Sequence, residues 1–418
     1  MTGQTIIQKI FQTHSPAGTD VTPGNIIWLD LDMRSARDFA GPNVVKNYRA
    51  HYGDAPVADK DKTCFTFDLV VPPSNIPYAR NQQICRIWAR EQGVKVYDVN
   101  AGIGSHVAIE EGLAYSGSTF VGADSHLNIL GAVGAFGQGM GDQDLAFAFK
   151  AGKIWFETPP TMKVILKGEI EPPCTARDLT LAVMSQLGSS GALGRAIEFY
   201  GPAIESLTLA GRITLASQVT EMGGIVGLIP PSEEVLAYAR ERVSRDDIQG
   251  VYADPDAEYV ETVEVDITGL EPLISCPPSP ANVKPVREVA GRRIDSVFIG
   301  SCTNGRFDDF ASAAAVVKGK HVAPRVMATA VPATHAVYEQ MLRSGVLATL
   351  FDAGFIISNP GCGGCASGHL GMTGEEQVNV STSNRNYPGK QGPGDTYLTS
   401  PVTAAWCALT GEITLPEV

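Results

Sequence analysis

Along most of the chain, short apolar runs alternate with longer segments in which apolar side chains recur every three or four residues. In the first third, the runs at 62–71, 94–102 and 118–126 are typical of buried strands, and the segments 76–93 and 106–117 are typical of helices. Strands and helices that alternate in this way predict parallel sheets covered by helices, the α/β class.

The same alternation returns in the last third of the chain, where most of the apolar runs end in a polar or glycine-rich turn. The predicted strands are 292–300, 324–332, 355–360 and 377–383, and the predicted helices are 307–319, 333–354 and 402–411. In open α/β sheets, ligands bind where loops leave the carboxyl ends of strands. The turns that follow these strands are therefore the places to look for chemistry.

The middle of the chain predicts a further unit, with strands at 161–170 and 196–201, a helix at 174–188 and a long helical stretch through 213–228. Four prolines then interrupt the pattern within 276–291, which makes that segment the best candidate for a linker. A length of 418 residues is enough for about three domains. We expect their limits at 1–160, 161–285 and 286–418.

The glycine-rich segment 131–152 invites comparison with phosphate-binding loops. Its glycines do not follow the G-x-G-x-x-G spacing that a dinucleotide site requires, so close packing of a helix is the better interpretation.

Composition narrows the class of protein. With 44% hydrophobic and 18% charged residues, the chain can bury several cores. Its formal net charge of −13 disfavours binding to nucleic acid or to anionic membranes. No apolar run is long enough to span a membrane, and no basic segment followed by an apolar core marks a signal peptide at the N-terminus. We therefore expect a cytoplasmic protein that binds neither nucleic acid nor membrane.

The eight cysteines fall into two groups. Five lie singly among apolar neighbours and are interpreted as small buried hydrophobic residues: Cys64, Cys85, Cys174, Cys276 and Cys407. The other three, Cys302, Cys362 and Cys365, lie in glycine-rich loops after predicted strands. Together with the cation Arg385, they are expected at one edge of a sheet.

Three thiolates leave several interpretations open. They suit an iron–sulfur cluster with one iron free to act as a Lewis acid. They also suit zinc, for which His369 is the candidate fourth ligand. Thiol redox chemistry and a site without metal remain as alternatives.

The motifs around these cysteines resemble those of the aconitase and 3-isopropylmalate dehydratase family. The segment 300–306 reads GSCTNGR and is similar to its first cluster motif, and CGGC at 362–365, followed by Gly368-His369, resembles its second. STSNRN at 381–386, with Gly389-Lys390, resembles its substrate-anchoring loop. GADSH at 122–126, followed by Gly131-Ala132, is similar to its aspartate–histidine loop. These motifs span about 65–390 in family order.

The resemblance implies three α/β/α domains around a [4Fe–4S] cluster, held by Cys302, Cys362 and Cys365 with one iron left open. A fourth, mobile domain that closes over the cluster in this family is not recognisable before Val418. The chain is therefore expected to be a large subunit. Its partner would be a small swivelling-domain subunit, in a heterodimer or a heterotetramer, that supplies the remaining catalytic residues.

The reaction implied is the hydration and dehydration of a small 2-hydroxy di- or tricarboxylate, with a serine of the mobile domain as the base. The resemblance assigns catalytic roles to Asp68, His106, Asp124 and His126, with Asp124 orienting His126. It assigns substrate binding to Arg37, Ser125, Asn304, Asn384, Arg385 and Lys390. Plain structural roles compete with these assignments: Asp124 and Ser125 can cap a helix, and Arg385 can lie in a surface turn.

Several positions depart from the family pattern. Leu69 stands where a histidine is usual, Ser105-His106 replaces a His-Gln pair, and Arg37 replaces a glutamine or histidine. A helix glutamate expected shortly after Met222 is interpreted as Ile225, and Lys390 replaces an arginine. These changes indicate a substrate other than citrate. They also leave two alternative functions open: a non-catalytic iron–sulfur relative that acts as a sensor or scaffold, and a Cys-x-x-Cys thiol oxidoreductase.

Overall fold

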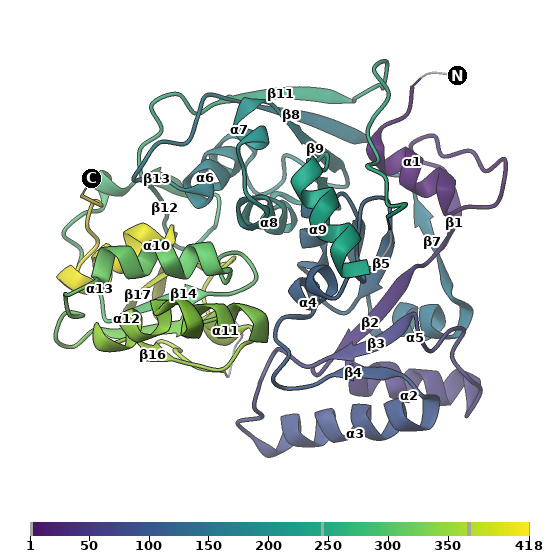
Figure 1. Ribbon diagram of the computed structural model, residues 1–418, viewed down its shortest axis with the longest axis horizontal. Coiled ribbons are helices and arrows are strands. Elements are labelled where there is room, and N and C mark those ends of the chain that lie inside the picture. The colour runs from purple at the N-terminus through teal and green to yellow at the C-terminus, as the bar shows by residue number, and fades with distance from the viewer. Residues whose placement is uncertain (1–2, 244–245, 366–368, 418) are drawn as a thin grey trace.

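The computed structural model describes residues 3–243, 246–365 and 369–417. Three principal sheets follow one another along the chain, and helices pack against them (Figure 1). The α/β class predicted from the sequence is confirmed. Among the described residues, no helix is both long enough and apolar enough to cross a membrane.

The first sheet has the strand order β4-β3-β2-β5-β6, and all its pairs are parallel. Its strands are β2 (Met33–Arg37), β3 (Thr63–Thr66), β4 (Lys95–Tyr97), β5 (Thr119–Gly122) and β6 (Phe136–Gly139). Its helices are α2 (Gly41–Tyr52), α3 (Ile76–Gln92), α4 (Gly104–Glu110) and α5 (Asp142–Ala151). An antiparallel ribbon of β1 (Ile26–Asp30) and β7 (Lys153–Glu157) lies beside it, as does α1 (Ile6–Thr13).

The second sheet is also parallel, in the order β10-β9-β8-β11. Its strands are β8 (Thr161–Lys167), β9 (Ala196–Tyr200), β10 (Val226–Leu228) and β11 (Glu261–Asp266). Its helices are α6 (Ala176–Leu187), α7 (Pro202–Glu205), α8 (Leu209–Ser217) and α9 (Glu233–Val243). The long helix predicted over 213–228 is therefore wrong in its second half. Gly223 adopts a φ of 82°, which ends the helical segment, and the next apolar run pairs with β9 as a strand.

The third sheet has the order β13-β12-β18-β17-β14-β15-β16, parallel except where β12 pairs with β13 and β18. Its strands are β12 (Leu273–Ser275), β13 (Val283–Pro285), β14 (Ser296–Gly300), β15 (Met327–Val331), β16 (Ile356–Ile357), β17 (Val378–Ser381) and β18 (Asp395–Thr399). Its helices are α10 (Phe307–Val317), α11 (His335–Ser344), α12 (Val346–Asp352) and α13 (Pro401–Thr410). The helix predicted over 333–354 is broken at Gly345, whose φ is 82°.

The proline-rich segment 276–291 is not a free linker. Its residues 276–282 form the turn between β12 and β13, and β12 pairs with β18 of the third sheet. Three of its prolines lie in that turn, and Pro285 lies in β13, an edge strand, where proline is tolerated. The domain limits 1–160, 161–285 and 286–418 stay a prediction.

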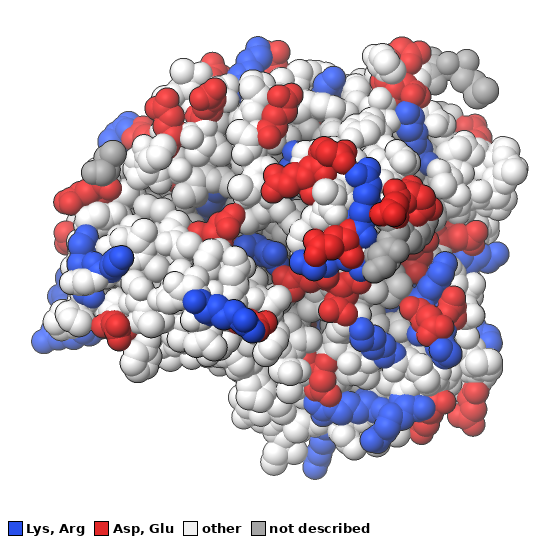
Figure 2. Space-filling model, viewed as in Figure 1, with Lys and Arg blue, Asp and Glu red and all other residues white. Residues whose placement is uncertain are grey.

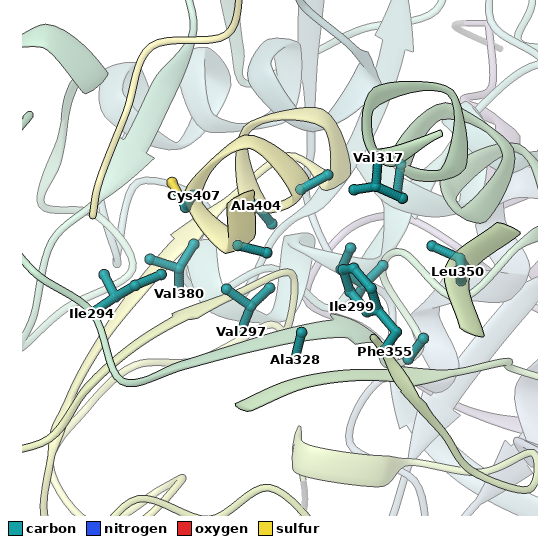
Figure 3. Packing of buried hydrophobic residues seen from close by; sticks show 14 of the residues in the cluster. Ile294, Val297, Ile299, Val317, Ala328, Leu350, Phe355, Val380, Ala404 and Cys407 are labelled. Carbon is teal, nitrogen blue, oxygen red and sulfur yellow. The ribbon is translucent and has the colours of Figure 1, made fainter. Parts of the chain in front are cut away.

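The core of the third unit lies between its sheet and its helices. Figure 3 shows Val297 and Ile299 of β14 facing Val317 of α10 and Ala404 of α13, all within one buried cluster. The five cysteines predicted to be buried hydrophobic residues are buried, which confirms that interpretation. The glycine-rich segment also packs as predicted. A Cβ at Gly131 would lie 2.0 Å from the carbonyl oxygen of Gly227, so only glycine allows that approach.

The surface mixes both signs of charge. Figure 2 shows acidic and basic side chains interspersed over the face viewed, in keeping with the moderate net charge of −13.

Candidate active site

One cavity of about 410 Å³ collects most of the residues that the sequence singled out. Its walls come from loops of the first and third sheets. The lining residues are Arg37, Phe39, Leu69, Tyr78, Ile103, Ala123, Asp124, Ser125, His126, Cys302, Cys362, Cys365, Arg385 and Lys390.

Strand ends explain why residues distant in sequence meet there. Arg37 is the last residue of β2, Asp124 follows β5 by two residues, and Cys302 follows β14 by two residues. Arg385 lies four residues beyond the end of β17. Because carboxyl ends of parallel strands share one edge of a sheet, Arg37 and Asp124 meet at one edge of the first sheet, and Cys302 and Arg385 meet at one edge of the third. Residues from both edges line the cavity.

The three cysteines line this cavity together. The Sγ atoms of Cys302 and Cys365 lie 3.3 and 3.9 Å from the same Oδ1 atom of Asn384. Asn384 is fully buried, and its Nδ2 has no hydrogen-bond partner. Gly363, between the two cysteines of the CGGC motif, has a φ of 58° and packs against Val331, which leaves no room for a side chain.

Burial and nearby acidic groups raise the pKa values of the Cys302 and Cys362 thiols. Binding of iron would displace these protons, since thiolates are the ligating form. The described residues do not already form a group of three His, Cys, Asp or Glu side chains spaced to hold a metal ion. The shared acceptor and the unpaired Asn384 Nδ2 nevertheless fit a sulfur-rich group in this cavity, because a cluster sulfur can accept from that amide.

The Cys₃His zinc site is not supported by the geometry. The ring of His369 lies against the backbone of Val71, with its Nε2 atom 3.3 Å from that carbonyl oxygen, and it does not line the cavity. Burial lowers the pKa of His369, as for a neutral imidazole inside the protein. Gly368, which belongs to the same sequence motif, lies outside the described residues.

A second group of charged residues faces the cysteines. The Oε1 atom of Glu221 lies 2.8 Å from Nε2 of His126 and 2.7 Å from Nε of Arg385. Although burial opposes ionisation, His126 and Arg385 hold the pKa of Glu221 below its usual range. On the other side of the ring, His126 Nδ1 lies 3.3 Å from Ser125 Oγ, which is 3.5 Å from Nη1 of Arg385.

Glu221 was missed by the sequence analysis, which placed the family's glutamate at Ile225. Ile225 instead packs in the core near α1. A signal was present, since Glu221 is the only acidic residue within 209–228. It follows that the orientation of His126 is also different from the prediction, because Glu221, not Asp124, contacts its ring.

Asp124 has another task. Its Oδ1 atom accepts a hydrogen bond from the backbone N–H of His126 at 3.0 Å and lies 3.0 Å from Nη1 of Arg37. Burial disfavours the charge, but Arg37 and His126 keep the pKa of Asp124 below its usual range. Asp124 therefore shapes the loop as a turn-forming aspartate and also pairs with a cation.

Asp68 lies on the other side of Arg37. Its Oδ1 atom accepts from Arg37 Nε at 2.8 Å, and its Oδ2 atom accepts from the backbone N–H of Gly104 at 2.8 Å. Burial raises the pKa of Asp68 to about 7, against the opposing effect of Arg37. Asp38 anchors the same loop by accepting from the N–H groups of Leu69 and Val70.

Four predicted site residues do not line the cavity: Asp68 and Asn384, which contact lining residues as described above, and His106 and Asn304. His106 is fully buried, and its Nε2 atom lies 2.9 Å from the carbonyl oxygen of Cys302. Burial and nearby Arg306 lower the pKa of His106 to about 3, so its ring is neutral and supports the cysteine loop from behind. Asn304 donates to Asp309 at 2.8 Å, in a separate cavity of about 330 Å³. The loop that carries Cys302 turns its following residues away from the main cavity.

Comparisons with known proteins agree with this arrangement. The model of the aconitase family (aconitate hydratase) matches residues 8–293 and 281–411. A 3-isopropylmalate dehydratase large subunit from Methanopyrus kandleri is 40% identical over 99% of both chains. A homoaconitase large subunit from Thermus thermophilus is also 40% identical, over 99% of this chain and 98% of the relative.

A solved structure shows the same fold. The crystal structure of aconitase X (holo-form) from Thermococcus kodakaraensis superposes with a TM-score of 0.51 and 12% identity. The match covers 86% of this chain and 84% of that one. From the family model, the full-length relatives and the cavity, we conclude that this chain belongs to the aconitase family.

Proposed function

We propose that this chain is the large subunit of an iron–sulfur hydro-lyase that adds water to, or removes it from, a small 2-hydroxy di- or tricarboxylic acid. One observation carries the proposal: Cys302, Cys362 and Cys365 line the same cavity as His126 and Arg385. Relatives that match over their full length are named dehydratase or homoaconitase large subunits.

The three cysteines would hold a [4Fe–4S] cluster. When bound, such a cluster supplies an open iron, a Lewis acid that makes hydroxide a feasible leaving group. Asn384 presents Oδ1 to the sulfurs of Cys302 and Cys365 while its Nδ2 is unpaired. A half-turn of this amide would let its N–H donate to a sulfur of the cluster.

Arg385 and Lys390 are the cations available for a substrate carboxylate. Glu221 occupies Nε of Arg385, which leaves the two Nη groups as a fork that matches a carboxylate. Ser125 Oγ lies beside that fork and can donate a further hydrogen bond. Lys390 lines the same cavity and adds a point charge.

His126 is the group placed to move a proton. Glu221 holds its Nε2 atom, so Nδ1, next to the Ser125 hydroxyl, is the nitrogen that exchanges a proton at the cavity. When the ring carries a proton on Nδ1, it would donate that proton to the departing hydroxyl group, which leaves as water. The opposite step, removal of the carbon-bound proton, is assigned to a serine of the small subunit.

That small subunit is the partner we propose, in a heterodimer or heterotetramer in the cytoplasm. Relatives of this chain bear the words "large subunit" in their names, which supports a two-subunit enzyme. Closure by a second chain would also exclude water from the cavity, which strengthens every charge interaction inside it.

The walls of the cavity favour one kind of substrate. Phe39, Leu69, Tyr78 and Ile103, all from the first unit, supply most of the apolar lining, whereas the cations Arg385 and Lys390 come from the third unit. A third carboxylate against the apolar lining would lose its hydration without gaining a partner. An alkyl-substituted 2-hydroxy diacid therefore fits better than a tricarboxylate.

The test is a substrate panel with the anaerobically reconstituted two-subunit enzyme. Malates with a methyl, isopropyl or carboxyethyl substituent are compared by the ultraviolet absorption of the unsaturated product. We expect the alkyl malates to have the highest kcat/KM, and Leu69→Arg to shift the preference toward the carboxyethyl substrate. A Cys365→Ser enzyme is the negative control. An iron-loaded complex that turns over no hydroxy acid of the panel would contradict the proposal and favour a sensor.

A further inference from the structure

Arg37 is a buried cation at the centre of the cavity's charged groups. It is the last residue of β2, and its side chain is only 10% exposed. The strand delivers it to the point where the Asp68 loop, the Asp124 loop and the CGGC loop come together.

All three nitrogens of its guanidinium group have close partners. Nε and Nη2 lie 2.8 and 2.6 Å from Oδ1 of Asp68, and Nη1 lies 3.0 Å from Oδ1 of Asp124. Nη2 also donates to Sγ of Cys362 at 2.9 Å. These contacts use four of the five N–H donors and leave one, on Nη1, which is too few for a two-point grip on a substrate carboxylate.

From these contacts we infer that Arg37 does not bind substrate but is a positioning residue. It holds the Asp68 and Asp124 carboxylates in place and stabilises the cluster through its N–H donation to Cys362. The inference rests on the proposed function, because it assumes a cluster at the three cysteines.

The physical reason is electrostatic. Two buried carboxylates and a thiolate within reach of one another repel, and burial makes that repulsion strong. A guanidinium between them cancels part of the charge and fixes the geometry with planar, directed donors. Hydrogen bonds to a ligand sulfur also favour the reduced, more negative cluster, so the reduction potential rises.

A backbone hydrogen bond also joins the Asp68 loop to the CGGC loop. The N–H group of Cys362 donates to the carbonyl oxygen of Asp68 at 2.9 Å. At Cys362, therefore, the CGGC loop is joined to the Asp68 loop both by this backbone hydrogen bond and through Arg37. Loss of the arginine would leave the backbone contact but remove the charge compensation.

The experiment compares Arg37→Gln and Arg37→Lys with wild type in the iron-loaded two-subunit enzyme. Arg34→Gln is the matched control, since Arg34 is equally buried on the same strand but donates to the backbone carbonyl oxygens of Leu31 and Asp59. The readouts are the midpoint potential from an EPR-monitored titration, the rate of iron loss to a chelator, and KM separately from kcat.

For Arg37→Gln we expect a lower midpoint potential, iron loss faster by roughly 10–100-fold, and a fall in kcat with little change in KM. Arg37→Lys keeps the charge and should recover part of the potential. Arg34→Gln should leave the potential and the iron-loss rate unchanged. If Arg37→Gln folds, keeps the wild-type potential and raises KM alone, Arg37 is a substrate ligand and the inference is wrong. Wild-type enzyme that never loads iron would instead overturn the proposed function itself.

Discussion

Replacement of Glu221 by glutamine is the sharpest test of the catalytic geometry. One carboxylate oxygen, Oε1, contacts both His126 and Arg385, so a single side chain positions the proposed proton donor and the proposed carboxylate-binding group. Glutamine keeps the size and can place its amide oxygen where Oε1 lies, so that both contacts can form. It removes the charge that strengthens them.

The magnitude follows from these two contacts. A hydrogen bond to a charged group is worth about 1.5–3 kcal/mol. Because both hydrogen bonds lose their charge assistance, and a charge-assisted bond is roughly twice as strong as a neutral one, we expect a total loss equal to about one such bond. That corresponds to a fall in kcat/KM of roughly 10- to 150-fold. Weakening of the contact to His126 should lower kcat, and weakening of the contact to Arg385 should raise KM.

Steady-state kinetics of the iron-loaded complex measure kcat and KM separately, after iron content and folding have been checked. Glu110→Gln is the control, because Glu110 pairs with Arg306 at similar burial but does not line the cavity. The control should lose stability and keep kcat/KM. A Glu221→Gln enzyme with full iron content and kcat/KM within about twofold of wild type would refute the reasoning about this network.

Three further predictions concern single residues. Arg385→Lys keeps a charge but loses the fork, so KM should rise by the equivalent of about 1.5–3 kcal/mol, whereas Lys390→Arg should have a milder effect in the same assay. The pKa of Asp68 is raised to about 7 by burial, so the folded state holds a proton that the unfolded chain has already released. The free energy of unfolding should therefore fall as pH rises from about 4 to 7. Urea unfolding at several pH values should show that this free energy depends less on pH in Asp68→Asn than in wild type. Cys302→Ser should abolish the visible absorption and bound iron of the anaerobically loaded enzyme, and stoichiometric zinc in the wild type would contradict this expectation.

The order of elements and the cysteine loops could be predicted from the sequence. Period-2 and period-3.6 patterns are local, and glycine-rich turns after apolar runs mark strand ends wherever they occur. Cys302, Cys362, Cys365, Ser125, His126 and Arg385 all lie in such turns. Parallel strands bring the turns of one sheet to one edge, so local signals implied that the cysteines and Arg385 lie together. That Ser125 and His126, which follow a strand of another sheet, share their cavity was implied only by the family resemblance.

Only the tertiary structure decided which side chains pair with the charged residues of the cavity. Glu221 reaches His126 from 95 residues away in sequence, and no local pattern distinguishes that pairing from the predicted one with Asp124. His106 and Asn304 adjoin cavity loops in sequence but turn behind them, because the direction of a side chain depends on backbone angles within each turn. The sequence by itself determined which loops carry chemistry. The packing of three sheets decided which side chains face one another, since long-range electrostatics act only between groups that the fold has already brought close.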